Sequence, residues 1–181
     1  CLSVWSGNDA YPKSIVDVGS GAGFPGIVLA ISLPHSQITL VESIGKKAEF
    51  CQLVINKLNL KNITVIQERV EIIGHSSSHR EKYDCSVARA VASLPVLCEY
   101  LLPLVKIHGQ MIAMKGNNGQ HEIDQASNVV PALGGKFIRS IPYVLPEESD
   151  PRMIIVIEKI KSNKENFSFK NTAVASDYVP G

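Results

Sequence analysis

The stretch VDVGSGAGFPG, residues 16–26, decides the fold of this chain. It begins inside an apolar, β-rich run at residues 14–18, and its glycines separate that run from a segment of helical character at residues 26–33. Glycine permits positive φ and lets a ligand approach bare backbone, and the N–H groups at the start of the following helix are unpaired. The stretch therefore predicts a strand, a ligand-binding glycine loop and a helix, in that order.

Short β-branched runs and longer segments of helical period alternate outward from this loop. Strands are predicted at residues 14–18, 37–42, 62–67, 83–88 and 109–115, and helices at residues 26–33, 46–58, 94–106 and 121–133. Such alternation is typical of a parallel sheet with helices on both faces. Two further runs, at residues 135–144 and 152–160, are joined too closely for a crossover helix and must pair antiparallel. The predicted fold is α/β, with a mostly parallel seven-stranded sheet that ends in an antiparallel hairpin.

Composition limits the class of protein. The 181 residues suit one domain, expected at residues 1–160, followed by a polar tail at residues 161–181. Apolar residues make up 45% of the chain, enough for a buried core, but the longest apolar stretch, residues 24–34, is too short to cross a bilayer. With 18 basic and 17 acidic residues the net charge is +1, which by itself does not indicate a nucleic-acid partner.

Cysteine usage and the absence of a recognisable secretory leader favour a cytoplasmic protein. The four cysteines, at positions Cys1, Cys51, Cys85 and Cys98, contain no CxxC pair, and three of them lie inside apolar segments. We interpret them as reduced core residues. Two histidines flank a serine-rich loop, His75 and His79, but no third ligand lies nearby in the sequence. We therefore predict no metal site and no membrane contact.

The glycine loop fits two kinds of nucleotide cofactor. Gly19, Gly21 and Gly23 have the GxGxG spacing that we associate with S-adenosylmethionine enzymes, whereas counting from Gly21 gives GxGxxG, the dinucleotide pattern. Glu42, at the end of the second strand, is placed to accept hydrogen bonds from both ribose hydroxyls of an adenosine group. Asp17 lies inside an apolar strand, where a carboxylate needs partners. It is expected either to orient the loop or to meet the cofactor's amino group through water.

The terminal hairpin separates the two cofactors. A dinucleotide-binding domain usually continues with parallel strands and a second, substrate-binding domain, for which 181 residues leave little room. A sheet that ends with an antiparallel strand is typical of S-adenosylmethionine enzymes. Methyl transfer is therefore favoured, and an NAD-binding oxidoreductase stays as an alternative.

Five stretches together resemble one family: residues 16–31 (VDVGSGAGFPGIVLAI), 40–51 (LVESIGKKAEFC), 68–71 (ERVE), 83–94 (YDCSVARAVASL) and 113–116 (AMKG). They resemble the glucose-inhibited division protein B family, in consistent order over about residues 15–160. Its members are small-subunit ribosomal RNA methyltransferases that modify N7 of a guanine with S-adenosylmethionine. The resemblance implies a Rossmann-like methyltransferase fold, S-adenosylmethionine as cofactor, and 16S ribosomal RNA or the 30S particle as partner.

The resemblance also implies roles for particular residues. Gly19 and Phe24 would contact the cofactor, Val70 and Glu71 would flank its adenine, and Arg89 would border the site. Spacing and resemblance together give the expected cofactor site, which comprises Gly19, Gly21, Gly23, Phe24, Glu42, Val70, Glu71 and Arg89. Family members usually carry a helical segment before the first strand, of which residues 1–8 are the expected remnant. They often end in a basic, proline-rich stretch that residues 161–181 lack.

The implied reaction needs no general base, since N7 of guanine has a free lone pair and no proton to lose. Orientation and exclusion of water can carry the rate. Consistent with this, the sequence has no NPP[YF] segment for amine methylation and no Pro-Cys nucleophile for carbon methylation. No catalytic base is therefore assigned.

Arg89 and Lys115 are the candidate contacts for the substrate or the transition state. Both lie at strand ends on the carboxyl side of the sheet, where ligands bind. Each is expected to hold an RNA phosphate, the guanine edge or the cofactor carboxylate. Otherwise it forms a structural ion pair, for which Glu42 and Glu71 are the candidate partners.

Two further alternatives stay open beside the oxidoreductase. One is a methyltransferase that acts on a small molecule or a protein, because the sheet determines the cofactor better than the acceptor. The other is a non-catalytic RNA-binding module. The chain is expected to act as a monomer.

Overall fold

The computed structural model describes residues 11–145 and 150–162 of the chain. The strands in these residues are β1 (Ser14–Val18), β2 (Gln37–Val41), β3 (Ile63–Ile66), β4 (Tyr83–Arg89), β5 (Val105–Lys115), β6 (Gly135–Tyr143) and β7 (Arg152–Lys159). The α-helices are α1 (Gly26–Ser32), α2 (Gly45–Lys57), α3 (Val70–His75), α4 (Leu94–Leu101), α5 (Gly119–Gln125) and α6 (Val129–Ala132). The predicted N-terminal remnant, Cys1 and nearly all of the predicted tail lie outside the described residues.

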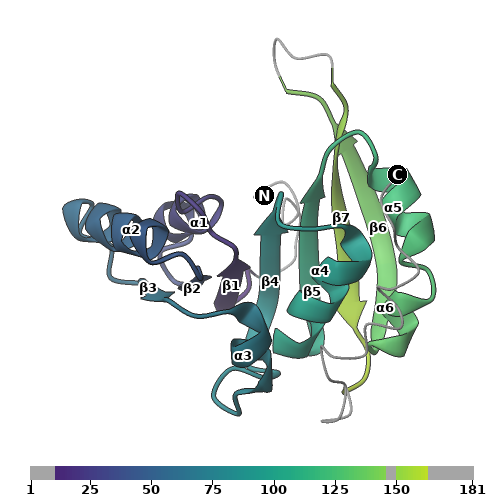
Figure 1. The fold of residues 1–181 in the computed structure, drawn as a ribbon, viewed down its shortest axis with the longest axis horizontal. Coiled ribbons are helices and arrows are strands. Elements are labelled where there is room, and N and C mark those ends of the chain that lie inside the picture. The colour runs from purple at the N-terminus through teal and green to yellow at the C-terminus, as the bar shows by residue number, and fades with distance from the viewer. Residues whose placement is uncertain (1–10, 146–149, 163–181) are drawn as a thin grey trace.

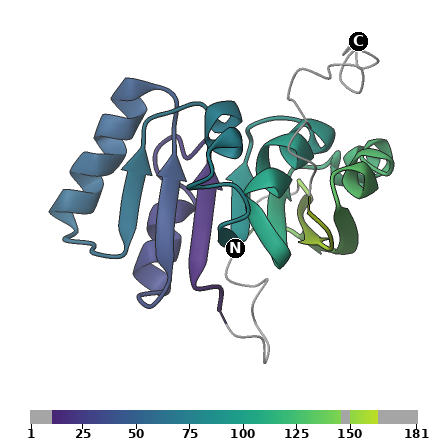
Figure 2. The ribbon, with the colours of Figure 1, turned by 90° about the horizontal axis from the view of Figure 1, so that it is seen from below.

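The strands form one seven-stranded sheet in the order β3-β2-β1-β4-β5-β7-β6. The pairs from β3 to β5 are parallel, whereas β7 pairs antiparallel with both β5 and β6. Figure 2 shows this sheet with β3 at one edge and the β6–β7 hairpin at the other. The predicted fold is confirmed, and the hairpin enters the sheet with β7 innermost.

Both faces of the sheet are buried because successive residues of each strand contribute to different cores. Ile15 belongs to the core beneath α1 and α2, while its neighbour Val16 belongs to the core beneath α3, α4 and α6. In β5, Ile112 likewise belongs to the core beneath α1 and α2, and its neighbour Met111 belongs to the core beneath α3, α4 and α6. Figure 1 shows α1 and α2 near the β1–β3 end of the sheet, and α4, α5 and α6 gathered around the β5–β6 end. The prediction of helices on both faces is confirmed.

The strand order reverses between β1 and β4. The chain leaves β1 toward β2 and β3 on one side, then returns to place β4 and β5 on the other. Loops at such a switch point diverge and leave a crevice at the carboxyl ends of the strands, where ligands of open α/β sheets bind. The glycine loop after β1 and the loop after β4 therefore flank the expected site.

Two predicted helices are wrong in their bounds. The predicted helix at residues 94–106 ends at Leu101 and is followed by a 3₁₀ turn, Leu102–Leu104, after which β5 begins at Val105 rather than Gly109. Pro103 explains the early end, since proline has no N–H and restricts the residue before it. β-branched Val105 then pairs with Tyr83.

The predicted helix at residues 121–133 is two short helices, α5 and α6, separated by a turn at residues 126–128. In one continuous helix Pro131 would remove a hydrogen bond and collide with the preceding turn, whereas in the first turn of α6 it is tolerated. Helix α3 was not predicted. Its six residues bury Val70, Ile73 and Gly74, and it is too short to show a clear helical period.

In the described residues no helix has the length and apolarity that a bilayer crossing requires. The same part of the chain holds no group of three or more histidine, cysteine or acidic side chains able to bind a metal ion.

Candidate functional site

The glycine loop turns back on itself directly after β1. Gly19, Gly21 and Gly23 all have positive φ, at 67°, 58° and 87°. The amides of Gly23 and Phe24 both donate to the Ser20 carbonyl, at 2.8 and 3.1 Å. Positive φ is strained for residues with a Cβ, so the sequence pattern reflects a backbone that only glycine adopts without cost. The loop presents main-chain atoms to the crevice.

Glu42 holds this loop against the start of α2. Its Oε2 accepts a hydrogen bond from the Gly21 amide at 2.8 Å, and its Oε1 accepts one from the Ile44 amide at 2.9 Å. The residue is only 5% exposed. A carboxylate has about four lone-pair sites, so two of them remain for further donors. Glu42 thus orients the loop, and its two remaining lone-pair sites can still accept hydrogen bonds from ribose hydroxyls, as the sequence predicts.

Asp17 fixes the far end of the same loop. It is fully buried in β1, and its Oδ2 accepts a hydrogen bond from the amide of Gly26, the first residue of α1, at 2.8 Å. This is the loop-orienting role expected from the sequence. The second carboxylate oxygen has no hydrogen-bond partner in the described residues. Burial raises the pKa of Asp17 to about 7, although the Gly26 amide and the positive charge of Arg89 oppose this.

A first cavity of about 190 Å³ opens beside the loop. It brings together three residues of the expected cofactor site, Gly19, Val70 and Glu71, which come from the glycine loop and from α3. The rest of its lining is Val18, Val41, Ser43, Glu68, Arg69, Val91 and Tyr100. Burial and the negative charge of Glu71 raise the pKa of Tyr100, so these two side chains lie together in the wall.

Arg89, the last residue of β4, lies over the ring of Phe24. Its guanidinium carbon is 5.7 Å from the ring centroid, within the range of a cation–π contact. Both side chains are exposed, and neither lines the first cavity as the structure has it. The two residues thus form an open rim over the glycine loop. No ion pair of Arg89 with the expected partners, Glu42 and Glu71, occurs among the described residues.

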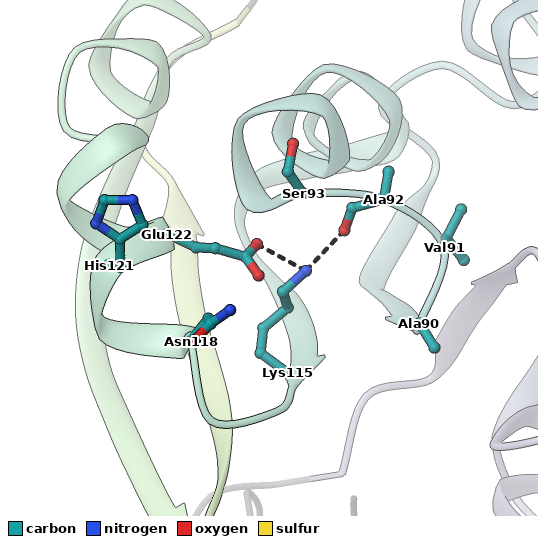
Figure 3. A pocket seen from close by; sticks show the side chains of 8 residues that line it. All are labelled: Ala90, Val91, Ala92, Ser93, Lys115, Asn118, His121 and Glu122. Atoms are coloured by element: carbon teal, nitrogen blue, oxygen red, sulfur yellow. Dashed lines mark hydrogen bonds and ion pairs between the residues drawn. The ribbon is translucent and has the colours of Figure 1, made fainter. Parts of the chain in front are cut away.

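A second cavity of about 370 Å³ lies on the other side of the β4–α4 loop, which comprises Ala90, Val91, Ala92 and Ser93. All four loop residues line it, together with Lys115, Asn118, His121 and Glu122, as Figure 3 shows. Val91 lines both cavities, so the two adjoin at this residue. A Cβ placed on Gly19 would lie 2.6 Å from Val91 Cγ2, which shows how closely Val91 packs on the glycine loop.

Lys115 is paired within this second cavity. Its Nζ donates to the Ala92 carbonyl at 2.7 Å and lies 2.7 Å from Glu122 Oε2. The sequence-based candidates for its partner, Glu42 and Glu71, are wrong, because α5 returns to the carboxyl end of β5 and brings Glu122 there. The Lys115 side chain is 8% exposed, so it is not a ready contact for RNA phosphate.

Several residues of the site were not predicted from the sequence. Val91, Tyr100, Asn118, His121 and Glu122 line the two cavities. Val91 lies in the stretch YDCSVARAVASL that carried the family resemblance, so that stretch held a signal for it. The other four follow no local pattern, and only the fold brings them to the strand ends.

Neither cavity is lined by the described cysteines or the histidine pair, although Cys51 Sγ donates to the Gly21 carbonyl of the glycine loop at 3.4 Å. Cys51, Cys85 and Cys98 are buried free thiols, as predicted for core residues. Burial raises the pKa of Cys85 and of Cys98 far above its usual value. His79 Nδ1 lies 2.7 Å from the Tyr83 hydroxyl, which gives that ring a structural partner.

The fold is the Rossmann-like fold of S-adenosylmethionine-dependent methyltransferases. A SAM-dependent methyltransferase from Aquifex aeolicus superposes with a TM-score of 0.61 at 14% identity, over 81% of this chain and 82% of that one. A variant of MtNAS, solved in complex with S-adenosylmethionine, superposes with a TM-score of 0.63 at 16% identity, over 88% of this chain and 60% of the other. At such identities the likeness establishes the fold.

Sequence comparison identifies the family within this class. The family GidB, rRNA small subunit methyltransferase G, matches residues 1–144. A relative from Roseiflexus sp. (strain RS-1), named ribosomal RNA small subunit methyltransferase G, is 44% identical over 160 residues, which are 88% of this chain and 67% of the relative. The chain belongs to this family. It spans about two thirds of the length of the curated relatives it matches.

Proposed function

We propose that this chain binds S-adenosylmethionine in the first cavity and transfers its methyl group to N7 of a guanine in 16S ribosomal RNA. The observation that carries the proposal is the pair of cavities at the carboxyl ends of β1 and β4, with Val91 lining both. Methyl transfer requires a donor site and an acceptor site within bonding distance of one another. Family membership favours ribosomal RNA over a small-molecule or protein acceptor.

The residues present fit this cofactor. Glu42 retains two lone-pair sites for ribose hydroxyls, while Val70 offers an apolar surface and Glu71 an acceptor for the adenine. The bare backbone of Gly19 and Gly21 lets the rest of the molecule lie against the loop. When bound, S-adenosylmethionine supplies an activated methyl group on a positively charged sulfur. The rim of Phe24 and Arg89 is then available to cover it.

The protein's own part in the reaction is to orient the reactants and exclude water. Since guanine N7 carries a lone pair and no proton, no residue has to act as a base. The glycine loop and the β4–α4 loop hold the two reacting groups on either side of Val91. Proximity and orientation alone can supply about 7–11 kcal/mol of a reaction barrier.

The partner that we propose is 16S ribosomal RNA, either naked or in the 30S particle. We further propose that the chain acts in the cytoplasm as a monomer, without a metal ion. The near-zero net charge agrees with RNA contacts that are local rather than spread over the surface.

Two measurements test the proposal. In calorimetry the chain is expected to bind S-adenosylmethionine and not NAD. With labelled S-adenosylmethionine it is expected to methylate 16S RNA or 30S particles from a strain that lacks the activity, with the label on N7 of one guanine. Unmodified particles and particles that already carry the methyl group serve as the matched pair of substrates.

Each alternative has its own outcome. Binding of NAD alone would support the oxidoreductase and reject the proposal. If the chain binds S-adenosylmethionine but the label appears on a protein or a small molecule, the methyl acceptor is that molecule and not RNA. RNA binding without any cofactor affinity would support a non-catalytic module.

A further inference from the structure

We infer that the second cavity holds the methyl-accepting base, and that Glu122 is a positioning residue that fixes the wall of this cavity. The inference rests on the proposed function and deepens it. It assigns the base pocket to the β4–α4 loop and α5, and it assigns Lys115 to the wall rather than to RNA phosphate.

The β4–α4 loop is held at two points by one ion pair. Glu122 Oε2 accepts a hydrogen bond from the Leu94 amide at 2.6 Å and lies 2.7 Å from Lys115 Nζ. Lys115 Nζ in turn donates to the Ala92 carbonyl at 2.7 Å. Figure 3 shows Nζ between the Glu122 carboxylate and the Ala92 carbonyl. The end of this loop and the first residue of α4 are thus fixed to the end of β5 and to α5 at once.

The local environment makes these contacts strong. The side chains of Lys115 and Glu122 are 8% and 16% exposed, so the pair is little screened by solvent. Removal of either member leaves the other with an uncompensated, largely buried charge. The loop also needs restraint, because Ala90 has a φ of 54°, a conformation that residues with a Cβ rarely adopt.

The electrostatics of the cavity favour a base over a phosphate. The charges of Lys115 and Glu122 compensate each other, and the lining also carries polar groups that can donate and accept, on Ser93, Asn118 and His121. The Gln125 amide nitrogen lies 3.1 Å from His121 Nε2. Paired donors and acceptors of this kind suit the edge of a guanine, which offers O6 as acceptor and an amino group as donor.

The size and position of the cavity also agree with a base. Its volume of about 370 Å³ lies within the range of about 300–1,000 Å³ that is usual for ligand pockets. It adjoins the cofactor cavity at Val91, so a base bound there can direct N7 toward the methyl group. Enzymes that modify a base in RNA commonly take it out of the stack into such a pocket.

The test compares three variants on α5. Glu122→Ala removes both contacts, Glu122→Gln keeps an acceptor for the Leu94 amide but removes the charge, and Asp124→Asn removes an exposed charge from the same helix. Three quantities are measured for each: the hydrogen exchange rate of the Leu94 amide, the Kd for S-adenosylmethionine, and the KM and kcat for RNA methylation.

We expect Glu122→Ala to accelerate exchange of the Leu94 amide at least tenfold and to lower kcat/KM for RNA at least thirtyfold, roughly the effect of a misplaced reacting group. The Kd for S-adenosylmethionine should change less than about threefold, since Glu122 does not line the first cavity. In Glu122→Gln the Leu94 amide should exchange more slowly than in Glu122→Ala, and RNA methylation should be faster than in Glu122→Ala but slower than in the wild type. Asp124→Asn should match the wild type.

Distinct results would overturn the two parts. Unchanged Leu94 exchange in Glu122→Ala would remove the positioning role. Faster exchange with unchanged RNA kinetics would show that the acceptor base binds elsewhere. An equal loss of cofactor affinity and RNA activity would reduce Glu122 to a general structural residue. A wild-type chain that binds S-adenosylmethionine but methylates no RNA contradicts the proposed function and the base pocket together, whereas the Leu94 exchange still decides the positioning role.

Discussion

The two cavities at the carboxyl edge of the sheet are built in different ways. The cofactor side is held by carboxylates that bind nearby backbone amides, Asp17 to Gly26 and Glu42 to Gly21, within the unit from β1 to the start of α2. The acceptor side is held by contacts among the end of β5, α5 and the start of α4, as when Glu122 of α5 accepts a hydrogen bond from the amide of Leu94. The loop of the cofactor side is thus anchored within the first β–α–β unit, and the acceptor side within a later part of the chain.

This difference has a functional meaning. Local carboxylate-to-amide bonds form whenever the β1–α1–β2 unit forms, so the cofactor side is preorganised. The acceptor side depends on β5 and α5 returning to the loop after β4, so substitutions on α5 should affect acceptor binding more than cofactor binding. The two sides should therefore respond to different substitutions, and the following changes test that separation from the largest expected effect to the smallest.

Glu42→Ala should break the cofactor side alone. The substitution leaves the amides of Gly21 and Ile44 without an acceptor and removes the group expected to bind ribose. Hydrogen bonds to charged groups contribute about 1.5–3 kcal/mol each, so calorimetry should give a Kd for S-adenosylmethionine raised about 10- to 100-fold. Glu49→Ala, an exposed acidic position on α2, is the control and should leave the Kd unchanged. Equal effects of the two variants would contradict the role of Glu42.

Asp17→Asn should remove a pH dependence that belongs to the cofactor side. Because burial raises the pKa of Asp17 from 3.8 to about 7, the folded chain binds a proton more tightly than the unfolded chain between these values. The stability of the wild type relative to Asp17→Asn should therefore fall as pH rises from 5 toward 7, and level off above 7. The expected change is on the order of 2 kcal/mol. Denaturant unfolding at pH 5, 6, 7 and 8 gives the free energy of unfolding of both proteins. A difference between the wild type and Asp17→Asn that stays constant over these pH values would contradict the prediction.

Gly23→Ala and Gly116→Ala compare the backbone of the two sides. Gly23 has a φ of 87°, and a Cβ there would collide with Ile27, whereas a Cβ on Gly116, after β5, meets nothing within 4 Å. Gly23→Ala should lower the free energy of unfolding by about 1–2 kcal/mol and weaken cofactor binding, because the loop must adjust. Gly116→Ala should be close to neutral in the same denaturant titration. A neutral Gly23→Ala would show that the loop is less constrained than its geometry indicates.

Arg89→Ala tests the border between the two sides. An exposed cation–π contact such as that with Phe24 contributes about 0.5–1 kcal/mol, so loss of this contact alone should change the cofactor Kd only about two- to fivefold. Arg89→Lys keeps the charge and serves as the matched variant. Cofactor affinity and methyl transfer are measured separately, and unchanged values for both would remove Arg89 from the site.

The contrast between the two sides also explains what the sequence predicts. The seven strands, the glycine loop and the orienting role of Asp17 follow from neighbouring residues, since apolar periodicity and glycine spacing are local properties. The sequence does not indicate the partner of Lys115 or the base pocket on α5, because no local period shows the turn that brings Glu122 back to the end of β5 and to the Leu94 amide. Helix α3 was missed for another reason, since six residues are too few to show a period.

The edges of the sheet bear on how this chain avoids pairing with other chains. A long, regular edge strand exposes unpaired amides and carbonyls and invites another strand to add to it. At one edge β3 has only four residues, which offers a short template. At the other edge β6 has a register shift between Phe137 and Arg139, and Pro142 removes one donor. These irregularities oppose edge-to-edge association even though Phe137 and Ile138 are exposed there.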